Sequence, residues 1–249
     1  AGNTLVGFAA LGEIKKSMEG DWIKIQSLPV IEENAELADR AFRMFQEMQT
    51  DQEMESEDFT SAKLELRKRL YQLEDELNRY LANEYGLDPN KKTAYEKWLK
   101  SHQPFHWFIE FYGILNNGGF DVIIGNPPYV EYTKVKGDYA IKGYETESCG
   151  NLYAFVVERS NIINKKSGYL SMIIQNSSVC TDRMFPMQDF LNNKYNHYFA
   201  NFDDRPAKLF TGMHHMKGTI FIGAPKISRQ SYSTTFLRWY DDFRPYIFD

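Results

Sequence analysis

The sequence predicts an α/β fold that carries an inserted helical hairpin. Three short runs rich in apolar, β-branched and aromatic residues are typical of strands, at 120–125, 169–175 and 195–202. Helical patterns at 151–166 and 182–194 separate these runs, and such alternation predicts a doubly wound, mostly parallel sheet. Residues 31–85 contain neither Gly nor Pro and are rich in helix-forming residues, which predicts the hairpin.

The composition is that of an ordinary globular protein. Of the 249 residues, 43% are hydrophobic and 25% are charged, and the sequence has no run of 18 apolar residues and no signal-peptide pattern. We therefore expect no membrane segment and a cytoplasmic location. Cys149 and Cys180 are expected to be free thiols of a reducing compartment. His102 and His106 have the spacing of ligands on one helix, but Pro104 lies between them, so no metal site is expected.

The net charge of −5 is unevenly distributed. Residues 1–120 carry 14 Lys and Arg against 21 Asp and Glu, whereas residues 121–249 carry 15 against 13. An acidic total argues against a protein that binds nucleic acid by charge alone. The second half is nevertheless mildly basic, and it contains the motif described below.

The first half is expected to begin with an irregular segment, residues 1–30. One helical stripe of the hairpin is made of leucines, namely Leu66, Leu70, Leu73, Leu77 and Leu81. The preceding helix has its own stripe, namely Leu37, Ala41, Phe45 and Met48. Gly86 and Pro89 end the hairpin, and a shorter helix is expected over 91–101, with Tyr95, Trp98 and Leu99 inward.

The second half supplies the sheet. The segment "FHWFIEF" at 105–111 alternates weakly and could be a strand or an extended segment. The run at 120–125 is apolar throughout, as in a parallel strand that is buried on both faces. Gly168 is expected to end the helix over 151–166, and Pro186 fits the first turn of the next helix. Because Pro and Gly interrupt the segment 203–217, the strands at 195–202 and 218–224 are expected to pair as an antiparallel edge.

The strand at 120–125 runs directly into Asn126, Pro127, Pro128 and Tyr129. The Asn126 side-chain oxygen and the Pro127 carbonyl could accept both protons of one NH₂ group, while the prolines hold the turn rigid. Two acceptors would localise the lone pair of a poorly nucleophilic amine, and Tyr129 offers a flat face for stacking. Asn176 follows the next strand in the same way, at the edge where parallel sheets bind ligands. A plain turn that closes the strand is the alternative interpretation.

The stretch "GGFDVIIGNPPYVEY" resembles the catalytic motif of N6-adenine amino-methyltransferases. Further blocks resemble, in order, those of TaqI-like and type IIG restriction–modification methyltransferases, namely "GNTLVG", "FHWFIEF", "NLYAFVVERS", "GYLSMIIQNS", "KLFTGMHHMKGTIFIGA" and "TTFLRWYDDFRPYIFD". The resemblance covers residues 1–12 and about 105–249. It implies part of a Rossmann-like class I methyltransferase sheet, mostly parallel with an antiparallel edge strand. It also implies a partial core segment at 1–30, a helical insert at 31–101 and the catalytic half at 102–249.

The resemblance implies the following roles. Asn126 and the Pro127 carbonyl bind the N6 amino group of an adenine flipped out of double-stranded DNA, Pro128 shapes the turn, and Tyr129 stacks on the base. Phe210 matches an aromatic residue that contacts the flipped base edge-on. The methyl donor is S-adenosylmethionine, and the position expected to contact it aligns with Val156, one residue after Phe155.

The sequence also departs from the pattern of this family. The glycine-rich loop that holds S-adenosylmethionine and the segment that recognises DNA are not found in it. We therefore expect a piece of a larger restriction–modification enzyme, which by itself binds the cofactor weakly and is inactive. A methyltransferase acting on protein glutamine, whose amide poses the same chemical problem, stays open as an alternative. So does a non-catalytic scaffold module that retains the fold.

Overall fold

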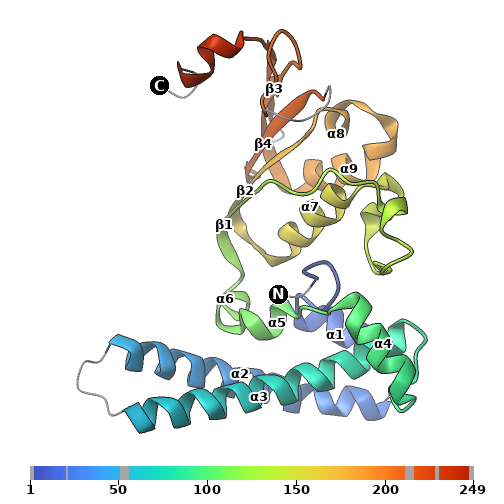
Figure 1. Ribbon diagram of the computed structural model, residues 1–249, viewed down its shortest axis with the longest axis vertical. Coiled ribbons are helices and arrows are strands. Elements are labelled where there is room, and N and C mark those ends of the chain that lie inside the picture. Colours follow the sequence, from blue (N-terminus) through green and yellow to red (C-terminus); the bar gives the residue numbers. More distant parts are fainter. Residues whose placement is uncertain (1–2, 21, 51–55, 211–215, 228–229, 247–249) are drawn as a thin grey trace. The chain divides into compact units, whose positions relative to one another are not determined.

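The computed structural model describes residues 3–20, 22–50, 56–210, 216–227 and 230–246. The chain divides into two compact units, unit 1 (Ala1–Gly119) and unit 2 (Phe120–Asp249) (Figure 1). The boundaries expected at 30/31 and 101/102 stay a prediction.

The described part of unit 1 is helical. Its helices are α1 (Leu11–Ser17), α2 (Trp22–Thr50), α3 (Ser56–Glu84), α4 (Lys92–His102), α5 (Trp107–Glu110) and α6 (Tyr112–Asn116). The predicted hairpin is formed by α2 and α3, which lie side by side (Figure 1). The prediction that residues 1–30 are irregular is wrong, because α1 and the start of α2 lie there. Pro29 lies inside α2, where it removes one N–H donor, and helix-forming residues continue the helix beyond it.

The hairpin buries four members of the predicted leucine stripe of α3, namely Leu66, Leu73, Leu77 and Leu81, each no more than 6% exposed, whereas Leu70 is partly buried. The stripe predicted for α2 is wrong at Leu37, which is exposed. The buried residues of α2 are instead Ile31, Ala35 and Ala38, and the small side chains of the two alanines allow two helices to approach closely. The side chains of Phe45 and Met48 lie outside the described residues.

The segment predicted as a possible strand, "FHWFIEF", forms α5 and leads into α6. Phe108, Ile109 and Tyr112 are buried at spacings of one, three and four residues, which fits a helical face and not alternation. The helix predicted over 91–101 is confirmed as α4, with Tyr95 and Trp98 buried. The strand prediction for 105–111 is therefore wrong.

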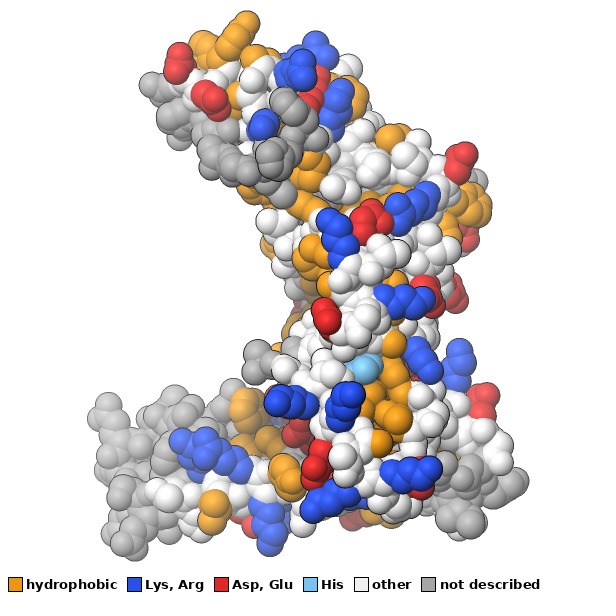
Figure 2. All heavy atoms as spheres, turned by 45° about the vertical axis from the view of Figure 1, so that its right-hand side comes forward, with side chains coloured by type: hydrophobic (Ala, Val, Ile, Leu, Met, Phe, Trp, Pro, Cys, Tyr) orange, Lys and Arg blue, Asp and Glu red, His pale blue; other side chains and the backbone are white. Residues whose placement is uncertain are grey.

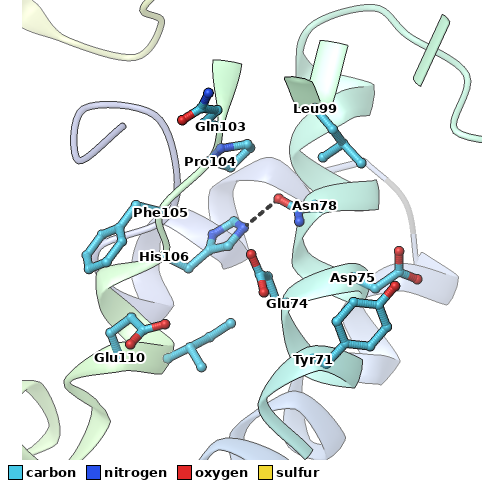
Figure 3. Close-up of a pocket in the computed structure, with 11 residues that line it drawn as sticks. Tyr71, Glu74, Asp75, Asn78, Leu99, Gln103, Pro104, Phe105, His106 and Glu110 are labelled. Carbon is cyan, nitrogen blue, oxygen red and sulfur yellow. Dashed lines mark hydrogen bonds between the residues drawn. The ribbon is translucent and has the colours of Figure 1, made fainter. Parts of the chain in front are cut away.

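A buried histidine joins separate segments of unit 1 (Figure 3). His106 Nδ1 accepts a hydrogen bond from the Phe8 N–H at 3.1 Å, so Nε2 carries the proton and donates it to Asn78 Oδ1, also at 3.1 Å. Beside this pair lies a cavity of about 580 Å³ whose walls include Glu74 and Glu110. Burial raises the pKa of both carboxyl groups, and the neighbouring Glu110 and Asp75 raise that of Glu74 further.

Unit 2 contains a five-stranded sheet in the order β1-β2-β4-β3-β5. Its strands are β1 (Phe120–Gly125), β2 (Asn164–Gln175), β3 (Tyr195–Phe202), β4 (Gly218–Pro225) and β5 (Ser231–Leu237). β1 pairs with β2 and β3 with β5 in parallel, whereas β4 pairs antiparallel with both β2 and β3. Four strands thus share one direction, which confirms the α/β fold and the predicted antiparallel pair. The reversed strand lies inside the described sheet, however, and not at its edge.

The helices α7 (Leu152–Ile163), α8 (Ser177–Cys180) and α9 (Phe185–Lys194) of unit 2 lie on one face of this sheet (Figure 1). The described part of unit 2 also contains the 3-10 helices η1 (Tyr132–Lys134), η2 (Glu145–Cys149), η3 (Asp182–Met184) and η4 (Asp241–Tyr246). Between the helices and the sheet lies a core whose largest fully buried members are Tyr153, Leu170, Met172, Ile174, Tyr195 and Phe221. This layer carries most of the hydrophobic stabilisation of unit 2.

The opposite face of the sheet is open. Residues paired across the strands on that face are exposed and hydrophobic, namely Val122, Ile124, Tyr169, Ile222, Tyr198 and Tyr232. Ile124 is 78% exposed, whereas Ile123 beside it packs on the core. Burial of the strand at 120–125 on both faces was therefore a wrong prediction for the described structure, in which helices cover only one face.

The predicted end of α7 also needs correction. The helix ends at Ile163, and β2 begins at once with Asn164, so Gly168 lies inside a strand. A Cβ atom at Gly168 would lie 2.3 Å from Asn164 Oδ1 and 2.8 Å from the Phe120 carbonyl oxygen. Glycine at this position therefore permits a close approach of β1 to β2 and does not terminate the helix.

Charged side chains are spread over the surface. On the face drawn in Figure 2, Lys and Arg side chains lie among Asp and Glu and do not gather in a single patch. Both predicted free thiols are confirmed, with Cys149 buried and Cys180 exposed. None of the helices in the described ranges is long and apolar enough to cross a bilayer.

Candidate functional site

The motif Asn126–Tyr129 leaves the sheet at the carboxyl end of β1, as the sequence predicted. Pro127 is buried, whereas Asn126 and Pro128 are exposed and Tyr129 is half-buried. The rigid prolines anchor the turn on the inside and leave the asparagine amide at the surface. One acceptor side chain and one aromatic ring are thus held close together at the sheet edge that binds ligands in open α/β folds.

Tyr129 fixes this turn to the neighbouring strand. Its hydroxyl oxygen lies 2.8 Å from Asn126 Oδ1 and 2.9 Å from the Ile173 carbonyl oxygen of β2. Its ring packs edge-on against Tyr153 of α7, with the ring centroids 6.3 Å apart. Burial raises the pKa of the Tyr129 hydroxyl to about 12, so the group keeps its proton at neutral pH.

The chain after the motif is tied to the start of α7. The Leu152 N–H donates to the Val130 carbonyl at 2.9 Å, and Asn151 caps the helix by accepting from the Tyr153 N–H. Glu131 forms an ion pair with Arg183 at 2.6 Å, and this hydrogen bond lowers the pKa of Glu131. Gly150 has φ +65°, and the Arg183 side chain occupies the place that a Cβ atom would take. The positive φ favours glycine at this position, and a Cβ atom would displace the end of the Arg183 side chain.

The chain between the motif and α7 is also held near its second end, by the buried carboxylate of Glu158 on α7. It accepts hydrogen bonds from the N–H groups of Glu145 and Thr146 at 3.0 and 2.9 Å, and from Thr146 Oγ1 at 2.7 Å. Three donors compensate the cost of burying the charge. The segment between the motif and α7 is thus held at both ends.

The two residues implied as cofactor contacts lie on α7. Phe155 is 0% exposed, and its ring is enclosed edge-on by Tyr132 and Tyr144, with centroids 5.1 and 5.2 Å away. Val156 is half-buried and packs on the core. Of the pair, only Val156 keeps part of its surface accessible, so cofactor contact by these residues stays a prediction.

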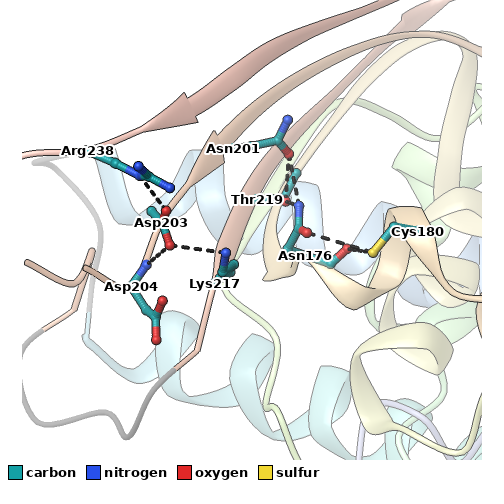
Figure 4. A network of polar contacts seen from close by, with 8 residues as sticks. All are labelled: Asn176, Cys180, Asn201, Asp203, Asp204, Lys217, Thr219 and Arg238. Carbon is teal, nitrogen blue, oxygen red and sulfur yellow. Dashed lines mark hydrogen bonds and ion pairs between the residues drawn. The ribbon is translucent and has the colours of Figure 1, made fainter. Parts of the chain in front are cut away.

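Asn176 follows β2 at the same edge, but its amide belongs to a structural network (Figure 4). Its Nδ2 lies 3.1 Å from Asn201 Oδ1 of β3 and 2.9 Å from Thr219 Oγ1 of β4. The side chain therefore joins three strands, in contrast to the exposed amide of Asn126.

Asp203, which follows β3, was not singled out from the sequence, although two acidic residues directly after a strand were a signal for it.

Phe210 lies on the connection from β3 to β4 and is partly buried. Because β4 runs opposite to β3, both ends of this connection lie at the carboxyl edge that also carries Asn126. The fold brings Phe210 to the same edge as the motif, and its contact with a base stays a prediction. His214 and His215 lie outside the described residues.

Comparison with known proteins gives one family match. The model of a family described as Eco57I restriction-modification methylase matches residues 24–210. A Methanocaldococcus jannaschii protein, described as combining a type II restriction enzyme and a methyltransferase, is 34% identical over 122 residues. That match covers 45% of this chain and 10% of the relative, so the chain spans about a tenth of the length of the relative.

Solved structures give weaker likenesses. A nuclease-deletion mutant of the Type ISP restriction–modification enzyme LlaGI, in complex with a DNA substrate mimic, has a TM-score of 0.39 at 14% identity. That likeness covers 52% of this chain and 16% of LlaGI. The Type ISP enzyme LlaBIII bound to DNA has a TM-score of 0.36 at 19% identity, over 53% of this chain and 11% of LlaBIII.

Proposed function

Because this chain belongs to the Eco57I restriction–modification methylase family, we propose that it forms the base-binding part of a DNA adenine N6-methyltransferase. The complete enzyme transfers a methyl group to the N6 amino group of an adenine flipped out of double-stranded DNA. The observation that carries the proposal is the exposed Asn126 amide beside Tyr129 at the carboxyl end of β1.

In this proposal, Asn126 Oδ1 and the Pro127 carbonyl accept the two protons of the adenine amine. The amine of a heterocycle is a weak nucleophile, because its lone pair is delocalised into the ring. Two acceptors favour a tetrahedral nitrogen with a localised lone pair, and they stabilise the positive charge that develops during attack on the methyl carbon. Pro127 and Pro128 supply the rigidity, so little entropy is lost when the amine binds.

Tyr129 and Phe210 bind the ring of the base in this proposal. Tyr129 is half-buried and anchored through its hydroxyl and through Tyr153, which supports a role as a fixed stacking surface. Phe210 contacts the base edge-on from the connection between β3 and β4. Stacking on aromatic side chains contributes about 1–3 kcal/mol per base in single-stranded nucleic acid complexes.

The methyl group comes from S-adenosylmethionine in this proposal, which supplies it as an electrophilic carbon on a sulfonium centre. The described residues provide little of a site for that cofactor, because Phe155 is enclosed and Val156 is only partly accessible. We therefore assign to this chain the binding and orientation of the amine, and we expect it to bind the cofactor weakly when isolated.

The test is Asn126→Ala in the complete protein. We expect methyl transfer to adenine-containing DNA to fall at least about 100-fold, because a preorganised polar contact to the reacting group is lost. DNA affinity should stay within about twofold, and Asn193→Ala, at an exposed asparagine of α9, is the matched control. Wild-type turnover by Asn126→Ala would refute the proposal. Mass spectrometry that finds the methyl group on protein glutamine instead would replace DNA as the substrate.

A further inference from the structure

The hydroxyl group of Tyr129 has one proton and two oxygen neighbours. Asn126 Oδ1 lies at 2.8 Å and the Ile173 carbonyl oxygen at 2.9 Å, and both are acceptors. The raised pKa of Tyr129 keeps the proton on the hydroxyl at neutral pH, so the group can donate one hydrogen bond. With the amide in this orientation, one of the two close oxygen–oxygen contacts lacks a full hydrogen bond.

A half-turn of the Asn126 amide removes this conflict. The turn exchanges Oδ1 and Nδ2, which have nearly the same shape. Nδ2 then donates to the hydroxyl oxygen, while the hydroxyl donates to the Ile173 carbonyl. Both contacts become hydrogen bonds, and Oδ1 is free on the exposed side of the turn.

The other partners of Tyr129 cannot adapt in this way. The Ile173 carbonyl belongs to β2, which pairs with β1 on one side and with β4 on the other. The ring of Tyr129 is held edge-on against the fully buried Tyr153. Asn126, by contrast, is exposed and its amide can rotate. Of the Ile173 carbonyl, the Tyr129 ring and the Asn126 amide, only the amide can therefore rotate so that both contacts of the hydroxyl become hydrogen bonds.

We propose that the Tyr129 hydroxyl is a positioning group that turns the Asn126 amide so that Oδ1 faces the incoming amine. The hydroxyl donates to the Ile173 carbonyl and accepts from Asn126 Nδ2. This inference rests on the proposed function for its catalytic consequence, but the hydrogen-bond arrangement itself does not. Tyr129 would then act on the reaction through Asn126, in addition to any stacking by its ring.

Side-chain amide exchange measured by NMR tests the arrangement on this chain without substrate or cofactor. In protein labelled with ¹⁵N-asparagine, the Asn126 NH₂ signal is identified by its loss in Asn126→Ala. We expect this NH₂ group to exchange with solvent about two- to tenfold more slowly than that of Asn192, an exposed residue of α9, because it donates a hydrogen bond. In Tyr129→Phe, which keeps the ring, the protection should disappear. Tyr169→Phe, at an exposed tyrosine of β2, is the control.

The opposite arrangement gives a different result. If the hydroxyl donates to Asn126 Oδ1, the NH₂ group is free in both proteins, and Tyr129→Phe leaves its exchange rate unchanged. That outcome overturns the proposal.

A second readout uses the complete protein. Tyr129→Phe should lower kcat for methyl transfer about two- to tenfold with the Kd for DNA unchanged, since the stacking ring remains. An unchanged kcat overturns the positioning role. Failure of the proposed function itself is recognised separately, because Asn126→Ala would then retain full activity whatever the exchange rates show.

Discussion

Arg238 directly follows β5, and its Nε donates a hydrogen bond to Asp203 Oδ2 at 2.6 Å (Figure 4). The other carboxylate oxygen of Asp203 lies 3.2 Å from Nζ of Lys217, which directly precedes β4. Asp203 itself follows β3 and is 4% exposed. One buried carboxylate thus joins the ends of three strands at the edge of the sheet that carries the candidate site.

This carboxylate should make unit 2 sensitive to acid. The hydrogen bond from Arg238 lowers the pKa of Asp203 far below its usual value of 3.8, with help from the Asp204 N–H and Lys217. A lowered folded-state pKa stabilises the fold fully above about pH 4, and this stabilisation is lost as the pH falls below that value. In Asp203→Asn, native-state hydrogen exchange of β2 amides should show lower stability at pH 7 and a smaller further loss between pH 4 and pH 2.5. Asp189→Asn, on the exposed surface of α9, is the control. Equal acid sensitivity of Asp203→Asn and the wild type would contradict the assignment.

Lys194 should have the opposite pH dependence. Burial, and secondarily Lys166, lowers the pKa of its ammonium group from 10.5 to about 8. The unfolded chain holds this proton more tightly, so the charged group destabilises the fold below about pH 8, and the penalty is relieved between pH 8 and 10.5. The wild type should therefore gain up to about 1 kcal/mol over this range relative to Lys194→Met, after allowance for solvent screening of a half-exposed group. Urea unfolding at pH 7.5 and 10 checks this, with Lys97→Met on α4 as the exposed control. A constant difference between wild type and Lys194→Met would rule it out.

Glu158 should contribute more to stability than any exposed acid of its segment. Its carboxylate accepts three hydrogen bonds from residues 145 and 146, so Glu158→Ala leaves those donors without their partner. We expect a loss of about 3 kcal/mol, measured by hydrogen exchange of β2 amides. Glu147→Ala removes only the exposed ion pair with Lys136 and should change stability by less than about 0.5 kcal/mol. Similar losses for the two variants would show that the buried carboxylate has no special role.

The sequence was a good guide where local chemistry decides the structure. The leucine stripe of α3 is buried at Leu73 and Leu77, and the apolar run at 120–125 is a strand that ends at the motif. It was a poor guide where the burial of a face depends on other segments. Val122, Ile123 and Ile124 are all apolar, yet only Ile123 faces the described core, and no local pattern distinguishes it from its neighbours.

β5 was missed for a related reason. Its seven residues, Ser231–Leu237, are all exposed, and five of them carry a hydroxyl group, so they show neither an apolar run nor strict alternation. The strand is specified instead by pairing with β3, a contact that is distant in sequence. At the candidate site, the position of Asn126 could be predicted, because the residue directly follows the predicted strand at 120–125. The link from Tyr129 to the Ile173 carbonyl joins residues 44 apart, so it could not be predicted locally.

The place of β4 in the sheet has a consequence for biosynthesis. β4 is made after β2 and β3, yet it fills the gap between them, so neither strand has that partner until residue 225 has left the ribosome. The nascent chain must keep two unpaired strand edges apart from other chains during this time, which is the period of greatest risk of aggregation. A chain that stops before residue 218 would not merely lose an edge strand, because it would lack the strand that joins the two halves of the sheet.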